Sequence, residues 1–301
     1  MHRGSLVVLD AAGGVVLAAG AVDRPTLPRS SNKPVQATAL LAAGGAPRST
    51  AELALGAGSH NGEDGHRELA AAMLAAAGLG ADDLRCPPAL PMHDPTSAQW
   101  LAAGREPERL AMNCSGKHAA MLSACVAAGW PTQGYLDRDH PLQQSIETRL
   151  ADAAGEPVTA VVVDGCGAPQ HALSVTGLAR SVLSLVQAPE GSHERAAADA
   201  MSAEPWFVAG TGREDTELMR AVPGLLVKGG ADGVHVAALP GRGAVALKLD
   251  DGSDRGRTPA LGAGLLRLGV PADLLARWLQ TPVSGGDGVV GEIRSAALLS
   301  A

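Results

Sequence analysis

Ser30 and Lys33 stand three positions apart, a spacing that places both side chains on one face if a helix begins here. A serine hydroxyl is a weak nucleophile until a neighbouring group takes its proton. A lysine takes that proton only when burial or a nearby cation lowers the pKa of its amine. The spacing therefore indicates a Ser-Lys nucleophile, with Ser30 attacking and Lys33 acting as base. The alternative is a helix-capping serine beside a solvated lysine.

Lysine is rare in this chain, which raises the interest of each position that keeps it. Of 24 basic residues only four are lysine: Lys33, Lys117, Lys228 and Lys248. Arginine serves wherever a solvated cation is enough, whereas lysine offers a compact amine that can lose its proton. Lys248 precedes two aspartates at 250–251, and we expect it to form an ion pair at a strand end.

Two further polar motifs follow along the chain. Residues 56–63 form a glycine-bounded polar loop that contains Ser59 and Asn61, flanked by His60, Gly62 and Glu63. Loops of this kind carry binding residues more often than idle polar ones. The second motif is Lys228-Gly229-Gly230 at the end of an expected strand, where a fixed cation and small residues would line a substrate groove.

Two glycine-flanked cysteines are candidate metal ligands. Cys114 opens an expected helix and Cys166 follows an expected strand, so two thiolates could converge on zinc. Spacing alone adds His118, one helical turn after Cys114. The alternative is a pair of buried, unreactive thiols, which is the reading we give Cys86 and Cys125. Four cysteines in a chain of this size do not predict a disulfide framework.

The elements that must position these residues follow from periodicity and turn signals. A β-hairpin is expected at 5–10 and 15–19, a buried strand at 158–163, and further strands at 225–230, 233–239 and 243–249. Helices are expected at 33–43, 49–55, 65–77, 114–128, 140–154, 173–186, 194–202, 213–220, 259–268 and 272–279. Residues 80–109 are expected to be a long proline-rich connection, and the last twenty residues featureless.

This order predicts an α/β fold with an antiparallel sheet flanked by helices. The 301 residues are expected to form a single domain, with a sheet lobe from 1–28 plus about 205–301 and a helical lobe of about 29–204. The net charge of −7 and the absence of basic clusters argue against nucleic acid or an anionic membrane as partner. No signal peptide and no membrane span is recognised, so a cytoplasmic location is expected.

The three motifs Ser30-x-x-Lys33, Ser59-x-Asn61 and Lys228-Gly229-Gly230 resemble those of the serine β-lactamase, penicillin-binding-protein and glutaminase superfamily, in which the third motif is Lys-Thr-Gly. Here Gly229 replaces the threonine. The cysteine motifs 113–118 and 164–169, with 29–37, 59–63 and 246–252, resemble the asparaginase II family of rhizobial-type, class 3 L-asparaginases. This resemblance covers roughly residues 5–270, and the cysteine motifs are its most specific part.

The resemblance implies a β-lactamase/glutaminase-like fold, a homodimer, bound zinc, and hydrolysis of L-asparagine to L-aspartate and ammonia. It implies that Ser30 is the nucleophile and Lys33 its base, and that Ser59 and Lys228 form a second Ser-Lys pair. It implies zinc ligation by Cys114, Lys117 and Cys166. Substrate contacts are expected from the following residues: Arg29, His60, Asn61, Gly62, Glu63, His118 and Asp164.

Two alternatives stay open from the sequence. One is a glutaminase or another serine amidohydrolase of the same superfamily, although the cysteine motifs and the missing export signal disfavour a β-lactamase. The other is a non-catalytic protein that binds an amino acid or zinc. The remaining histidines carry no partner signal and are expected to be structural or exposed: His66, His93, His140, His171, His193 and His235.

Overall fold

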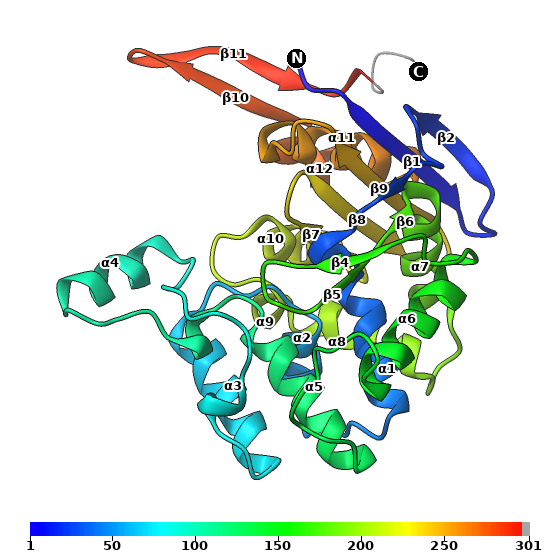
Figure 1. The fold of residues 1–301 in the computed structure, drawn as a ribbon. Coiled ribbons are helices and arrows are strands. Elements are labelled where there is room, and N and C mark those ends of the chain that lie inside the picture. The colour runs from blue at the N-terminus through cyan, green and yellow to red at the C-terminus, as the bar shows by residue number, and fades with distance from the viewer. Residues whose placement is uncertain (297–301) are drawn as a thin grey trace.

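The computed structural model describes residues 1–296, and its centre is a five-stranded antiparallel sheet (Figure 1). The strands lie in the order β2-β1-β9-β8-β7. Their bounds are Gly4–Asp10 for β1, Val15–Ala19 for β2, Leu226–Gly230 for β7, Val234–Leu239 for β8 and Gly243–Leu249 for β9. The first hairpin therefore joins a sheet whose other strands come from more than 200 residues later. The predicted antiparallel sheet flanked by helices is confirmed.

Helices cover both faces of this sheet. Every residue of β8 is buried, which requires apolar cover on each side of the strand. Helix α7 (Val175–Gln187) packs on β1, β8 and β9, and α11 (Asp254–Arg267) packs on the same strands. Gly264 of α11 permits the close approach, because a Cβ there would lie 2.5 Å from the Val245 side chain. In Figure 1 α11 and α12 (Ala272–Leu275) lie above the sheet and most other helices below it.

The helices below the sheet include those that carry the candidate site residues. They are α1 (Lys33–Ala42), α2 (Thr50–Gly56), α3 (Asp64–Ala76), α5 (Ser115–Ala128), α6 (Pro141–Ala154), α8 (His193–Ala203), α9 (Pro205–Val208) and α10 (Glu214–Ala221). Serine side chains cap α2, α7 and α8 by accepting an amide N–H from the first turn. These helices were predicted to within a few residues at their ends, except for α9, which the sequence did not predict.

Short 3₁₀ turns and two-residue strands complete this part of the chain. The turns are η1 (Arg29–Asn32), η2 (Ala81–Asp83), η3 (Arg109–Ala111) and η4 (Ala276–Trp278), and β3 (Pro25–Thr26) pairs with β6 (Leu173–Ser174). No helix within residues 1–296 combines the length and the apolar character that crossing a bilayer requires.

Three local predictions are wrong. The predicted buried strand at 158–163 is only β4 (Val161–Val163), which pairs with β5 (Pro169–His171) in a separate ribbon, and Val163 is 77% exposed. A run of β-branched residues sets strand propensity but not burial. The connection at 80–109 contains a helix, α4 (Asp94–Ala102), with proline at its start. The tail forms a hairpin, β10 (Gln280–Gly285) with β11 (Gly288–Arg294). In Figure 1 both α4 and this hairpin project from the body.

Candidate functional site

The Lys33 amine lies at the centre of a buried polar cluster at the start of α1. Its side chain is 1% exposed. Lys33 Nζ donates hydrogen bonds to the Gly58 carbonyl oxygen at 2.7 Å and to Ser59 Oγ at 2.8 Å, and it lies 3.1 Å from Cys114 Sγ. The cluster thus joins the first residue of α1, the loop after α2 and the N-cap residue of α5. A buried amine that touches a serine hydroxyl is the arrangement that Ser-Lys chemistry requires.

Ser30 lies in the 3₁₀ turn η1, immediately before α1, and is half-buried. The Lys33 backbone N–H donates to the Ser30 carbonyl oxygen, so the two residues follow one another on the same side of a tight turn. Within residues 1–296 the Ser30 hydroxyl has no hydrogen-bond partner, and the serine that bonds Lys33 is Ser59. The pairing of Ser30 with Lys33 therefore stays a prediction. The hydrogen bond between Lys33 and Ser59 joins the Ser30-x-x-Lys33 motif to the Ser59-x-Asn61 motif.

Arg29 holds a strained backbone conformation next to the nucleophile candidate. Its φ of 51° lies in the left-handed region, which residues other than glycine rarely adopt. Its Nε donates to Asp164 Oδ1 at 2.7 Å, and its Nη1 donates to Asp232. Burial of Asp164 would raise the pKa of its carboxyl, but the Arg29 charge, a hydrogen bond from the Gly165 backbone and the Lys117 charge together hold that pKa below its usual value. Both predicted substrate contacts, Arg29 and Asp164, are thus ion-paired with each other.

The loop of Ser59 is fixed by hydrogen bonds within the protein. His60 is fully buried; its Nε2 bonds Ser115 Oγ at 3.0 Å and its Nδ1 accepts the Gly62 amide N–H at 3.0 Å. Burial, followed by the charges of His66 and Lys33, holds the pKa of His60 well below its usual value. The ring is therefore neutral, and both of its nitrogens form hydrogen bonds that hold the loop in place.

Asn61 and Glu63 connect the same loop to the segment before α10. Asn61 Oδ1 accepts from Arg213 Nη1 at 3.0 Å, and its Nδ2 donates to the Thr211 carbonyl oxygen at 3.0 Å. Glu63 Oε1 accepts the Thr211 amide N–H at 2.8 Å. Hydrogen bonds from Thr211 overcome the effect of burial and lower the pKa of Glu63. The structure thus gives these predicted substrate contacts a role in holding Ser59 in place.

Cys114, Lys117 and Cys166, the predicted zinc ligands, lie together and are all buried. Lys117 Nζ is 3.1 Å from Cys166 Sγ. A hydrogen bond from Cys166, aided by the charges of Lys33 and Lys117, holds the pKa of the Cys114 thiol well below its usual value against the cost of burial. A thiolate such as Cys114 is a ligand that zinc prefers. The hydrogen bond with Cys114 raises the pKa of the Cys166 thiol, and the two sulfurs raise the pKa of the Lys117 amine against the effect of burial, so both groups would have to lose a proton to bind a metal.

Other side chains do not complete a conventional metal site. Within the described part of the chain no group of three His, Cys, Asp or Glu side chains is arranged to hold a metal ion. His118 donates or accepts through Nδ1 at 2.7 Å from the Tyr135 hydroxyl, and its buried Nε2 has no hydrogen-bond partner among residues 1–296. Burial lowers the pKa of His118 to about 4, so its ring is neutral.

Lys228, the fourth predicted catalytic residue, is 1% exposed on β7. Burial lowers the pKa of its amine to about 7, while Asp215 opposes the shift. Lys228 Nζ lies 3.8 Å from Asp215 Oδ2. The charge of Lys33 also contributes to the shift, which places the two amines within electrostatic reach of each other. Lys248, by contrast, donates to two backbone carbonyl oxygens rather than to the aspartates at 250–251, so its predicted ion pair is wrong.

The end of β7 approaches the turn that carries Ser30. A Cβ at Gly230 would lie 2.7 Å from the Pro28 carbonyl oxygen and 3.3 Å from the Ser31 nitrogen. Only glycine fits this approach without moving one backbone away from the other. Gly230 therefore allows β7, the strand that carries Lys228, to lie beside η1.

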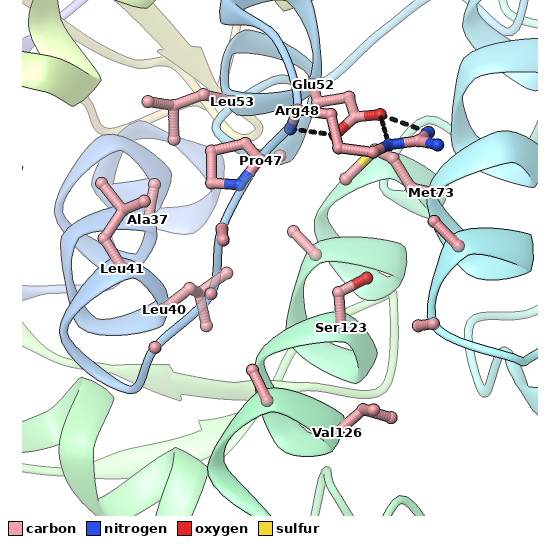
Figure 2. A pocket seen from close by; sticks show the side chains of 18 residues that line it. Ala37, Leu40, Leu41, Pro47, Arg48, Glu52, Leu53, Met73, Ser123 and Val126 are labelled. Atoms are coloured by element: carbon pink, nitrogen blue, oxygen red, sulfur yellow. Dashed lines mark hydrogen bonds and ion pairs between the residues drawn. The ribbon is translucent and has the colours of Figure 1, made fainter.

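A cavity of about 280 Å³ lies away from these groups, between α1, α2, α3 and α5 (Figure 2). Its walls are aliphatic, and the ion pair of Arg48 with Glu52 lies at its edge. None of the predicted site residues lines it. The chemistry-bearing groups gather instead at the opposite ends of α1 and α5.

Comparison with known families decides between the classes of protein that this cluster allows. A family model described as L-asparaginase II matches residues 1–295. The chain belongs to the L-asparaginase II family. Membership confirms the resemblance read from the motifs. No curated protein matches the chain in a comparison of whole sequences.

Solved structures give more distant likenesses to this L-asparaginase II family chain. Mglu in its glutamate form is 14% identical over 88% of this chain and 61% of its own, with a TM-score of 0.49. A β-lactamase from Mycobacterium bovis is 15% identical over 92% of this chain and 95% of its own, with a TM-score of 0.44. A β-lactamase from Desulfarculus baarsii DSM 2075 is 19% identical over 82% of each chain, with a TM-score of 0.31. The chain spans about three fifths of the length of Mglu.

Sequence reasoning missed Asp215, which the structure places against Lys228. Asp215 is the second residue of α10 and is 5% exposed. No local motif marks it, because its partners lie in β7 and β8 and meet it only in the folded chain. An aspartate in the first turn of a helix is ordinary. What marks Asp215 as unusual is its burial, which the sequence does not show.

Proposed function

We propose that the chain is an L-asparagine amidohydrolase, which hydrolyses the side-chain amide to L-aspartate and ammonia. The observation that carries the proposal is the buried Lys33 amine, 2.8 Å from Ser59 Oγ and at the start of the helix that follows Ser30. Family membership supports the amide as the bond that is cleaved. The choice of asparagine follows from the motif resemblance.

In the proposed first half-reaction Ser30 Oγ attacks the side-chain amide carbon of the substrate. The Ser30 proton passes to the Lys33 amine, and Ser59, which contacts that amine, relays a proton to the departing ammonia. Lys228, at the end of the strand beside η1, polarises the substrate. Water then releases aspartate from the acyl-enzyme, with the same groups returning the proton to Ser30. Backbone amides near the start of α1 stabilise the oxyanion.

The ion pair of Arg29 and Asp164 would recognise the amino-acid end of the substrate. A free amino acid carries one ammonium and one α-carboxylate, the complement of this pair. On binding, Asp164 would turn toward the ammonium and Arg29 toward the carboxylate. The Arg29 side chain is 24% exposed and the Asp164 side chain 11%, so both lie at the edge of the cluster.

We propose zinc as a structural partner of this pocket, held by Cys114, Lys117 and Cys166. When bound, the metal would supply a fixed positive charge that orders the two sulfurs and the lysine. The catalytic steps above belong to the protein side chains. Lys117 would have to bind as a neutral amine, a proton loss that metal binding itself drives.

The assembly and location expected from the resemblance, a cytoplasmic homodimer, also remain proposals. Light scattering coupled to size-exclusion chromatography measures the mass in solution. A mass near twice that of the 30.2 kDa chain supports the dimer, and a mass near 30.2 kDa contradicts it.

Ammonia release from asparagine and glutamine, assayed side by side with ring opening of a chromogenic β-lactam, tests the activity. We expect asparagine to be turned over fastest, Ser30→Ala to abolish turnover while the protein stays folded, and wild type to accumulate an acyl-enzyme visible in its intact mass. Ser31→Ala is the matched control, because in the described part of the chain the Ser31 hydroxyl bonds only the Pro28 carbonyl oxygen. Substantial turnover by Ser30→Ala would contradict its assignment, and an acyl group on Ser59 would move the nucleophile there.

The two alternatives give different results in the same assay. A glutaminase or other amidohydrolase would prefer another substrate while keeping the dependence on Ser30 and Lys33. A non-catalytic protein would bind zinc or asparagine and release no ammonia.

A further inference from the structure

Asp215 ties three elements together behind Lys228. Its Oδ1 accepts from His235 Nε2 at 2.8 Å, and its Oδ2 accepts the Gly229 amide N–H at 2.8 Å. Since Gly229 follows Lys228 on β7 and lies opposite His235 on β8, one carboxylate of α10 fixes the strand end that bears the lysine. The same carboxylate is 3.8 Å from Lys228 Nζ. The lysine amine itself donates to the Gly229 carbonyl oxygen at 2.6 Å.

His235 is as deeply buried as the carboxylate it contacts and has a second acidic neighbour. Its Nδ1 lies 3.9 Å from Glu214 Oε1, and neither atom has a hydrogen-bond partner among residues 1–296. Glu214 is itself paired with Arg257 of α11, whose Nη1 also donates to the Gly230 carbonyl oxygen at 3.0 Å. His235 thus lies between two carboxylates, and Arg257 holds the outer one.

The charges that act on Lys228 come from several elements around it. Lys33 at the start of α1 and Arg213 before α10 disfavour its protonated form, whereas Asp215 and Cys114 favour it. Lys228 makes no hydrogen bond to the proposed zinc ligands within the described residues. Burial brings its pKa down to about 7, and Asp215 keeps it from falling further. For Asp215 the balance is the reverse: burial would raise its pKa, but His235 and then Lys228 hold it far below its usual value.

We propose that Asp215, held by His235, is the positioning residue for Lys228: it fixes the part of β7 that carries the amine and keeps the amine able to gain and lose a proton during turnover. This inference rests on the catalytic role proposed above for Lys228. A carboxylate at 3.8 Å in a buried site favours the charged amine strongly. Without it, the neighbouring cations and burial would leave Lys228 neutral at all physiological pH values and unable to return a proton.

The scarcity of lysine makes a direct test possible. Protein labelled with ¹⁵N-lysine has only four Nζ signals, and Lys228→Met assigns the one of interest. We expect that signal to titrate near pH 7 in wild type and about one to three pH units lower in Asp215→Asn. The kcat/KM profile against pH should show a limb that moves in the same direction. Glu217→Gln, a carboxylate on the same helix that pairs with surface arginines, should leave the signal and the limb in place.

His235 provides a second test if Asp215→Asn does not fold. His235→Leu removes the donor to Asp215 and should lower kcat at least tenfold, while His235→Gln, whose amide can donate in its place, should restore most of it. An unmoved Lys228 signal in folded Asp215→Asn, or equal activities for the leucine and glutamine variants, would overturn the proposal. A shifted Nζ signal supports the control of Lys228 by Asp215 even if wild type fails to hydrolyse asparagine, a failure that would count against the proposed function alone.

Discussion

Replacing Lys33 gives the sharpest test of the proposed chemistry. Lys33→Met keeps the length of the side chain but removes the amine, and Lys33→Arg keeps a cation that cannot lose its proton under assay conditions. Loss of a general base lowers kcat by about 10²–10⁴-fold, and more when the base and the nucleophile act as one unit. We expect both variants to fall in this range. If Lys33 acted only through its charge, Lys33→Arg would stay active.

The structural effect of the same change is much smaller. Lys33→Met leaves the Gly58 carbonyl oxygen and Ser59 Oγ without this donor, at a cost of about 1–3 kcal/mol each, partly offset because no amine has to be buried. A net loss of about 1–3 kcal/mol lowers Tm by roughly 2–10 °C in a protein of this size. Since native proteins have about 5–15 kcal/mol of stability, the variant stays folded at 25 °C and unfolding cannot explain a hundredfold loss of turnover.

The assay is continuous ammonia release with asparagine, with Tm measured on the same samples. Lys248→Met is the matched control and should change kcat less than twofold, because within residues 1–296 Lys248 bonds only backbone carbonyl oxygens at a strand end. Turnover by Lys33→Met or Lys33→Arg above about one tenth of the wild-type rate would refute the role of Lys33 as base.

Three other predictions follow from single contacts. Gly230→Ala should lower kcat/KM at least tenfold and stability by about 1–3 kcal/mol, because its Cβ would lie 2.7 Å from a backbone oxygen of the turn before Ser30; Gly288→Ala, with open space around it, should change neither. Glu63→Gln should lower Tm by a few degrees at pH 7, where the carboxylate is charged and accepts the amide of the 211 segment. Because the folded pKa of Glu63 lies below its unfolded value, this contribution is present above about pH 4.3 and is lost as the pH falls through the folded value, so melting curves of the two proteins should converge near pH 3. Cys166→Ser should lower the zinc bound per chain, measured by elemental mass spectrometry after dialysis, by at least tenfold, whereas zinc retained at the wild-type ratio would exclude Cys166 as a ligand.

The scarcity of lysine is the feature of the sequence that best indicates the buried polar cluster. Lys33, Lys117 and Lys228 are 1–3% exposed, whereas Lys248 is only partly buried. Burying an amine is costly, so a chain that uses arginine elsewhere keeps lysine where the amine has a partner inside. The choice of lysine over arginine therefore indicated which cations are buried, whereas the apolar periodicity of the sequence did not. The choice of lysine could not indicate which serine Lys33 contacts. Ser59 lies beside Lys33 because α2 packs against α5, and this packing is set by the tertiary structure.

The hairpin, the sheet strands and most helices were predictable because apolar periodicity and glycine turns mark them locally. The errors came where tertiary context decides. Residues 158–163 have the composition of a buried strand, yet β4 lies at the surface and Val163 is largely exposed. The strands β10 and β11 are mostly exposed, so their sequences lack the alternation of apolar and polar residues that predicts a strand. A two-stranded ribbon on the surface is the kind of element that sequence patterns describe least.

The departure from the Lys-Thr-Gly pattern has a physical explanation that links the sequence to the site. A Cβ at Gly229 would lie 3.3 and 3.4 Å from the two Asp215 carboxylate oxygens, closer than most side chains come to a neighbour. A threonine there would push the carboxylate away from the Gly229 amide and from Lys228. Glycine at this position and a buried aspartate on α10 therefore require each other, because the space that the missing side chain leaves is the space that Asp215 occupies. Gly229→Thr should accordingly reproduce the downward shift of the Lys228 titration expected for Asp215→Asn, and a titration left in place would show that Asp215 can act on the amine from elsewhere.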